Sequence, residues 1–283
     1  MRWTPGGESR NIEDRRGSGG IGMMPAGIGG TVVLVILSLI FGRDFLTGSG
    51  GGDPTQAGAS SGQIAPPANQ SPEEAKEVQF VSFVLDSAQA AWSRILPETM
   101  GRPWHDAKLV LFRNATQTGC GVGEAAMGPF YCPMDQKLYI DLSFYDELHN
   151  RFGAPGDFAE AYVLAHELGH HVQHLMGTDA AVRRAQQQNP DAANELSVRL
   201  ELQADCYAGV WAHETQRENI LDPGDIEEGM NAAASVGDDR IQRETTGRVN
   251  QDTFTHGSSA QRVSWFKRGL DRGEPKDCNT FGG

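Results

Sequence analysis

The sequence predicts an α+β fold, mostly helical with a small sheet, preceded by a single transmembrane helix and a flexible linker. Two short apolar runs, KLVLF at 108–112 and LYIDL at 138–142, are typical of strands. After residue 157 every periodic stretch has the spacing of a helix. Strands first and helices later favour the α+β class. An uncharged stretch at 21–42 precedes them all.

Residues 21–42 have the length and composition of a membrane span. They read IGMMPAGIGGTVVLVILSLIFG, and about 20 such residues cross the ~30 Å hydrocarbon core of a bilayer. A buried core helix would show a polar stripe, and a cleaved signal peptide would have a shorter charged start and a small-residue cleavage site. We therefore predict a membrane anchor that contacts the lipid bilayer.

Basic residues near the span predict its orientation, because Lys and Arg concentrate on the cytoplasmic side. Residues 1–20 are therefore expected to form a cytoplasmic tail of a single-pass cell-membrane protein, with the following domain outside. Only Arg43 follows the span closely, whereas four arginines precede it: Arg2, Arg10, Arg15 and Arg16.

Residues 43–71 are rich in Gly, Ser, Pro and Ala, and such a segment buries too little apolar surface to offset its ordering entropy. We expect a flexible linker there and one domain at 72–283. The formal net charge of -13 and the lack of a Lys/Arg cluster exclude a nucleic-acid partner.

Capping residues, prolines and apolar periodicity predict where the helices of this domain begin and end. Ser71 is a candidate N-cap before Pro72, and Pro97 is expected to end the helix that follows. Later helices are predicted at 157–176, 191–216, 223–243 and 258–270.

Four cysteines are present, and none has C-x-x-C spacing, which disfavours a zinc ribbon. An even count in an exported domain favours disulfides. Cys120 and Cys132 bracket a Gly/Pro-rich turn and form the first expected pair, and Cys206 with Cys278 forms the second. Four free buried thiols are the alternative.

The stretch AHELGHHVQHLMG at 165–177 carries the candidate chemistry, and helix geometry decides which of its histidines can share an ion. His166 and His170 are four residues apart, so both rings lie on one helix face. Glu167 points about 100° away from His166, where it can reach a water on the ion but not act as an equal ligand. This is the H-E-x-x-H arrangement, which binds zinc through neutral imidazole and uses the glutamate as general base.

The other two histidines fail the same geometric test. His174 lies ~12 Å along the helix axis from His166, too far for one ion. His171 points about 100° away from His170. Both are predicted to be surface or packing residues.

A catalytic zinc usually has three protein ligands, so one more is expected downstream. In ELSVRLELQADCYAGVWAH, Glu201 and Asp205 share a helix face that continues with the small residues Ala208 and Ala212. Glu201 is the candidate third ligand to one zinc ion per chain, with Asp205 as hydrogen-bond partner of a ligand histidine. The alternative is a solvated face, on which Glu195 is an equally good acid.

Several motifs in order resemble the bacterial neutral zinc metallopeptidase family over almost the whole chain. HELGHH and ELQADCYAG carry the resemblance, with MRW at the start, GPFYCP at 128–133, LYIDLSF at 138–144 and THGSSAQR at 255–262. The resemblance implies a zincin-like fold, with an active-site helix under a small sheet whose edge strand lines the substrate cleft. It also implies His166, His170 and Glu201 as zinc ligands and Glu167 as the catalytic acid/base.

A looser similarity links the chain to membrane metalloproteases that follow HExxH with E-x-x-x-D and HPP-x-x-x-R. His256 and Arg262 keep the His-to-Arg spacing, although both prolines are absent. His256 or Arg262 is then a candidate catalytic donor to the oxyanion of the tetrahedral intermediate. The alternative is that Ser258 or Ser259 caps the last helix and Arg262 makes a structural ion pair.

The strand at 139–142 is a candidate edge strand, to which a peptide could add by main-chain hydrogen bonds. An ordinary core strand is the alternative. Together these features predict a membrane-anchored zinc endopeptidase that acts on a peptide or protein substrate. A zinc-stabilised binding or scaffold protein without turnover, and a zinc amidase acting on cell-wall peptides, are the rival hypotheses.

Overall fold

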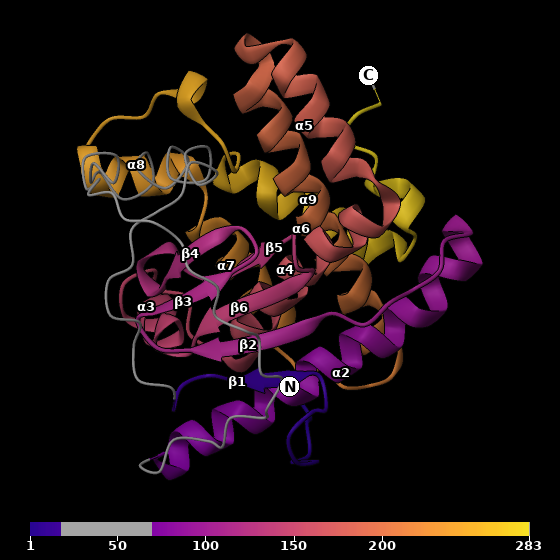
Figure 1. Cartoon of the computed structure of the whole chain (residues 1–283), viewed down its shortest axis with the longest axis vertical. Helices are drawn as coiled ribbons and strands as arrows, with labels where there is room; N and C mark the ends of the chain where they lie inside the picture. The colour runs from indigo at the N-terminus through magenta and orange to yellow at the C-terminus, as the bar shows by residue number, and fades with distance from the viewer. Residues whose placement is uncertain (18–69, 283) are drawn as a thin grey trace, which may run out of the picture.

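The computed structural model describes residues 1–17 and 70–282, and Figure 1 shows a small sheet surrounded by helices. Four strands form the main sheet in the order β1-β2-β6-β5. β1 is parallel to β2 and β2 to β6, whereas β5 is antiparallel to β6. β3 and β4 form a separate two-stranded antiparallel sheet. The strand bounds are β1 Ile12–Asp14, β2 Lys108–Phe112, β3 Ala115–Thr118, β4 Gly121–Glu124, β5 Phe130–Cys132 and β6 Lys137–Asp141.

More residues lie in helices than in strands, which agrees with the prediction of a mostly helical α+β fold. Their bounds are α2 Pro72–Met100, α3 Ser143–Asn150, α4 Asp157–Met176, α5 Thr178–Gln188, α6 Ala193–Arg217, α7 Asp225–Ser235, α8 Asp238–Thr246 and α9 Ser259–Arg272. The predicted helix at 223–243 is wrong as one piece. It divides into α7 and α8 at Gly237, where a Cβ would lie 2.4 Å from the backbone nitrogen of Ser259.

Helix α2 begins where the sequence predicts and ends later. The Ser71 side chain accepts a hydrogen bond from the backbone N–H of Glu74, which caps the first turn. Pro97 was expected to end the helix, but it lies inside it. The helix ends at Gly101, whose left-handed φ of 64° allows its N–H to reach the carbonyl of Pro97.

The core lies between the sheet and the long helices α2, α4 and α6. Trp92 of α2 packs edge-on against Tyr207 of α6, with ring centroids 5.4 Å apart. Phe158 of α4 stacks on Trp211 of α6 at 5.8 Å. α4 is therefore covered on several sides, and a buried helix of this kind holds its side chains in fixed positions.

Residues 1–17 belong to the same domain as residues 70–282. β1 pairs with β2, and Ile12 lies opposite Leu109. The sequence predicts that residues 1–20 lie outside the domain at 72–283, whereas the structure pairs residues 12–14 with β2 of that domain.

The predicted membrane span at 21–42 and all but the last two residues of the predicted linker at 43–71 lie outside the described residues. Within the described parts of the chain, no helix has both the length and the apolar character needed to cross a membrane.

Two disulfides tie the domain together. Cys120 bonds to Cys132, and Cys206 of α6 bonds to Cys278 near the C-terminus. This is the pairing that the sequence spacing favours.

Candidate metal centre

The site forms where helices α4 and α6 cross closely. A Cβ on Gly169 of α4 would lie 2.9 Å from the carbonyl oxygen of Ala204 in α6 and 3.1 Å from its Cα. Both of those atoms belong to the backbone and cannot move aside. The glycine therefore allows an approach that a larger residue would prevent, and this approach brings the H-E-x-x-H face to Glu201.

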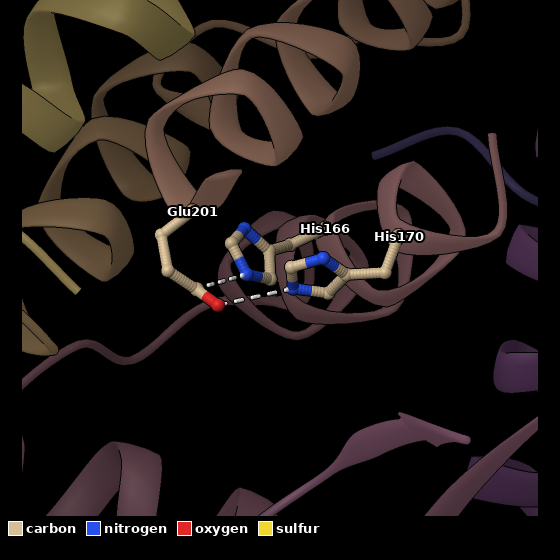
Figure 2. A group of neighbouring side chains, drawn as sticks. All are labelled: His166, His170 and Glu201. Carbon is tan, nitrogen blue, oxygen red and sulfur yellow. Dashed lines mark hydrogen bonds and ion pairs between the residues drawn. The ribbon is translucent and has the colours of Figure 1, made fainter. Parts of the chain in front are cut away.

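Three side chains converge at this crossing. Nε2 of His166 lies 3.1 Å from Oε2 of Glu201, and Nε2 of His170 lies 3.4 Å from Oε1. Figure 2 shows both imidazole rings, from one helix, turned towards the carboxylate of Glu201 on another. Their candidate ligand atoms all lie within 4.8 Å of one another.

The spacing of these atoms fits a zinc ion. Zinc binds imidazole nitrogen at about 2.0–2.1 Å in tetrahedral sites, so two of its ligand atoms lie about 3.4 Å apart. The two nitrogen-to-oxygen distances, 3.1 and 3.4 Å, agree with that value. Two imidazoles and one carboxylate leave the fourth position of a tetrahedral ion open, which is the ligand set of a catalytic zinc.

The charges around the site favour a cation at its centre. Burial lowers the pKa of His166, but Asp205 and Glu201 outweigh it and raise that pKa to about 10. Burial raises the pKa of Glu201, yet His170 and His166 hold it well below its usual range. The carboxylate is thus ionised, and the two rings lie where a positive charge is stabilised.

Both histidines present the same ring nitrogen to Glu201 because each Nδ1 has its own acceptor. Nδ1 of His166 lies 2.8 Å from Oδ1 of Asp205, and Nδ1 of His170 lies 2.8 Å from Oε1 of Gln173. An Nδ1–H that donates to a neighbour leaves Nε2 unprotonated for a metal. Asp205 occupies the position that the sequence predicts, whereas Gln173 was not singled out.

Gln173 is oriented by contacts that only the folded chain provides. Its Nε2 donates to the carbonyl of Leu200 at 2.7 Å and to Oε1 of Gln203 at 3.1 Å, so its Oε1 faces His170. The sequence places Gln173 three residues after His170, on the same face of α4, and that spacing is the one signal that could have identified it.

Arg262 lies behind His166 in a buried ion pair with Asp205. Its Nε donates to Oδ2 and its Nη2 to Oδ1, each at 2.9 Å. Tyr162 also donates its hydroxyl to Oδ1 of Asp205. Ser258 caps α9 by accepting from the N–H of Gln261. The structure therefore contains both features of the alternative to an oxyanion role for Arg262: a helix cap and a structural ion pair.

His256 faces the same cavity as Glu201, from the loop before α9. Its backbone N–H donates to Oδ2 of Asp238 at 2.6 Å, and its Nδ1 lies 3.3 Å from Oδ1 of the same carboxylate. Asp238 fixes the loop and the ring together. Both oxyanion candidates line the cavity. The guanidinium of Arg262 is bonded to Asp205, whereas Nε2 of His256 has no hydrogen-bond partner among the described residues.

Glu167 lines the cavity beside both histidines and is 9% exposed. Burial raises its pKa, although His170 and His166 oppose that effect. A carboxyl with a raised pKa is a better proton acceptor and donor near neutral pH than an exposed one.

His171 and His174 lie outside this cluster. His171 is fully buried, and its Nε2 donates to the carbonyl of His105 at 2.7 Å, so its Nδ1 accepts from the hydroxyl of Tyr131 at 3.0 Å. His174 lies 3.0 Å from Asp179. His171 thus connects strand β5 to the helix that carries the two candidate histidine ligands.

The edge of the main sheet next to α4 is β5, at residues 130–132. The prediction that residues 139–142 form the edge is wrong, because β6 lies between β2 and β5. β5 is only three residues long and ends at Cys132, the second cysteine of a disulfide-bonded loop, so it lacks the pattern by which strands are recognised in a sequence.

A cavity of about 390 Å³ opens over the site. Glu167 and the three candidate ligands form its polar wall, and β5 contributes Phe130 and Tyr131. The lining also includes the apolar side chains of Phe144, Phe152, Val163, Val236 and Ile241.

Comparison with known proteins places the chain in a family. The sequence profile described as "Putative neutral zinc metallopeptidase" matches residues 1–281. The chain is 49% identical over 292 residues to Uncharacterized protein YpfJ of Escherichia coli (strain K12), covering 100% of this chain and 99% of that protein. It is 47% identical over 207 residues to Uncharacterized protein Rv2575 of Mycobacterium tuberculosis (strain ATCC 25618 / H37Rv), covering 69% and 68%. No solved structure matches it.

The profile covers almost the whole chain and includes the helices that carry the three candidate ligands. By that match, the chain belongs to the putative neutral zinc metallopeptidase family.

Proposed function

We propose that the protein is a zinc endopeptidase in which His166, His170 and Glu201 hold one zinc ion and Glu167 is the general acid/base. The observation that carries the proposal is the convergence of two Nε2 atoms on the Glu201 carboxylate at 3.1 and 3.4 Å, with Glu167 on the wall of the same cavity. A protein that only bound zinc would not need Glu167 beside the ligands, so its position favours catalysis over a scaffold role.

A zinc ion bound there would acidify a water and polarise the substrate carbonyl. Glu167 accepts the proton of the attacking water as the C–O bond forms. It then delivers that proton to the departing amine, so that the C–N bond breaks when the tetrahedral intermediate collapses to the carboxylic acid and the amine. Asp205 and Gln173 hold the two rings in the orientation that leaves Nε2 free. The imidazole of His256 is placed to donate a hydrogen bond to the developing oxyanion.

The cavity also suggests how a substrate is held. β5 is an edge strand, so an extended peptide can add to it through main-chain hydrogen bonds. The apolar wall around Val163 and Phe144 then accepts a large apolar side chain next to the scissile bond.

Substitution of Glu167 by Gln tests the proposal. We expect the variant to keep its zinc and to cleave an unfolded protein substrate at least about 100-fold more slowly. Glu195→Gln is the matched control, because Glu195 is an exposed glutamate on α6. Full activity in Glu167→Gln would overturn the mechanism. Zinc without any hydrolysis in the wild type would favour the scaffold hypothesis, and cleavage of a peptidoglycan digest alone would favour the amidase.

A further inference from the structure

The N-terminal segment 1–17 completes the sheet that supports the candidate site. β1 adds to β2 in parallel, with Glu13 opposite Val110 and Asp14 opposite Leu111. The N–H of Leu109 in turn donates to the carbonyl of Asn11 at 2.8 Å. Without this segment β2 would be an open sheet edge, and its backbone groups on that side would lose their partners.

Side-chain contacts bind the same segment to the domain at several separate points. Trp3 packs on Phe80 of α2 with ring centroids 5.3 Å apart. The hydroxyl of Ser9 donates to Asp86 of α2 at 2.5 Å. Ile12 is 8% exposed and belongs to the main hydrophobic core. The segment is therefore a packed part of the domain.

Three of the four arginines that suggest a cytoplasmic tail, Arg2, Arg15 and Arg16, form ion pairs in the fold. Arg2 lies 2.7 Å from Asp222. Arg16, with 1% of its side chain exposed, lies 2.6 Å from Asp14 and 2.9 Å from Glu74 of α2. Charges that are paired with carboxylates of the domain have a structural role there, so their position before residues 21–42 does not require a cytoplasmic location.

We propose that residues 1–17 and 70–282 fold as one unit on the extracytoplasmic side of the membrane, so that the chain enters and leaves the segment 18–69 on that same side. The two disulfides favour the extracytoplasmic side, because such bonds persist in oxidising compartments. A single crossing within residues 21–42 would separate β1 from β2 by the ~30 Å hydrocarbon core. The proposal does not depend on the peptidase activity.

A designed cross-link tests whether the two parts meet in the full-length protein in membranes. Ser9→Cys and Asp86→Cys place two thiols where hydroxyl and carboxylate now touch, and a protease site is inserted between residues 47 and 60. All four native cysteines lie after residue 100, so the N-terminal fragment has no other thiol. After oxidation and cleavage, the two fragments should stay linked on a non-reducing gel.

Ser9→Cys combined with Gln187→Cys is the matched control. Gln187 is exposed on α5, which lies at the opposite end of the molecule from β1 in Figure 1, so these fragments should separate. Separation of the Ser9/Asp86 pair to the same extent as the control would overturn the proposal.

Labelling in intact cells determines the side of the membrane and does not depend on the cross-link. Two single variants are made separately: Thr4→Cys adds an exposed thiol to residues 1–17, and Gln187→Cys adds one to residues 70–282. A membrane-impermeant thiol reagent should label both before lysis. Labelling of Gln187→Cys alone would show a single crossing and overturn the proposal, and protection of both until lysis would overturn the extracytoplasmic assignment.

Discussion

Replacement of Arg262 by Ala should lower both the stability of the fold and the zinc affinity, because Arg262 holds Asp205, the hydrogen-bond partner of His166. The Arg262 guanidinium makes two hydrogen bonds of 2.9 Å to Asp205, which is fully buried. Burial raises the pKa of Asp205, but Arg262 and His166 outweigh it and lower that pKa to about 2, so the carboxylate is ionised at neutral pH. Removing one partner of a buried ion pair costs about 3–5 kcal/mol.

That loss can be measured as a shift in melting temperature. A change of 1 kcal/mol moves the Tm of a chain of this size by about 2–4 °C, so Arg262→Ala should melt roughly 6–20 °C lower. Zinc affinity should fall about 10–100-fold, because Asp205 would no longer hold His166 in one orientation. Both quantities are obtained from thermal denaturation and a chelator competition.

Two further variants test whether the loss comes from the broken Arg262–Asp205 ion pair. Lys267→Ala removes an exposed cation from the same helix and should change stability by no more than about 0.5 kcal/mol. Arg262→Met combined with Asp205→Asn removes both charges and should recover part of the Tm but not the zinc affinity. If Arg262→Ala keeps the Tm and the zinc affinity but loses turnover, Arg262 acts on the substrate and the reasoning is refuted.

Three more predictions follow from the packing around α4. Gly169→Ala should lower the Tm and weaken zinc binding, because its Cβ would meet the backbone of Ala204 at 2.9 Å; unchanged values would show that the helices can separate freely. Burial and neighbouring carboxylates raise the pKa of Glu160 to about 8, so stability should fall as pH rises from about 4.5 to about 8, and Glu160→Gln should flatten that fall in urea titrations. Val163→Phe should fill the apolar wall and reduce kcat/KM at least about tenfold for peptides with a large apolar residue, but little for those with alanine there.

The site helix could be predicted from the sequence because its signals are local. The predicted bounds, 157–176, are those of α4, which ends at Gly177 with a left-handed φ of 76°. Glu201 could be found because an acid beside small residues on a helix face indicates a partner. For Gln173 the sequence offers only its spacing from His170, because its orientation depends on the carbonyl of Leu200 in a helix that only the fold brings near.

The sheet was harder to predict because its outer strands are short and depend on distant partners. β1 is the tripeptide Ile-Glu-Asp and β5 is Phe-Tyr-Cys, and neither has an alternation long enough to mark a strand. β1 pairs with a strand almost 100 residues later, across the segment 18–69. Such pairings leave no local pattern, so in the sequence only the charge of the N-terminal arginines indicates a role for them.

The zinc affinity of Glu201→Gln, compared with that of Glu167→Gln in the same chelator competition, tests the central claim most directly. Glu201 is assigned to the metal and Glu167 to the proton transfer. We predict that Glu201→Gln lowers the affinity by more than about 100-fold, because a ligand matters more than the groups that orient it. Glu167→Gln should bind zinc nearly as well as the wild type. Wild-type affinity in Glu201→Gln would contradict the account.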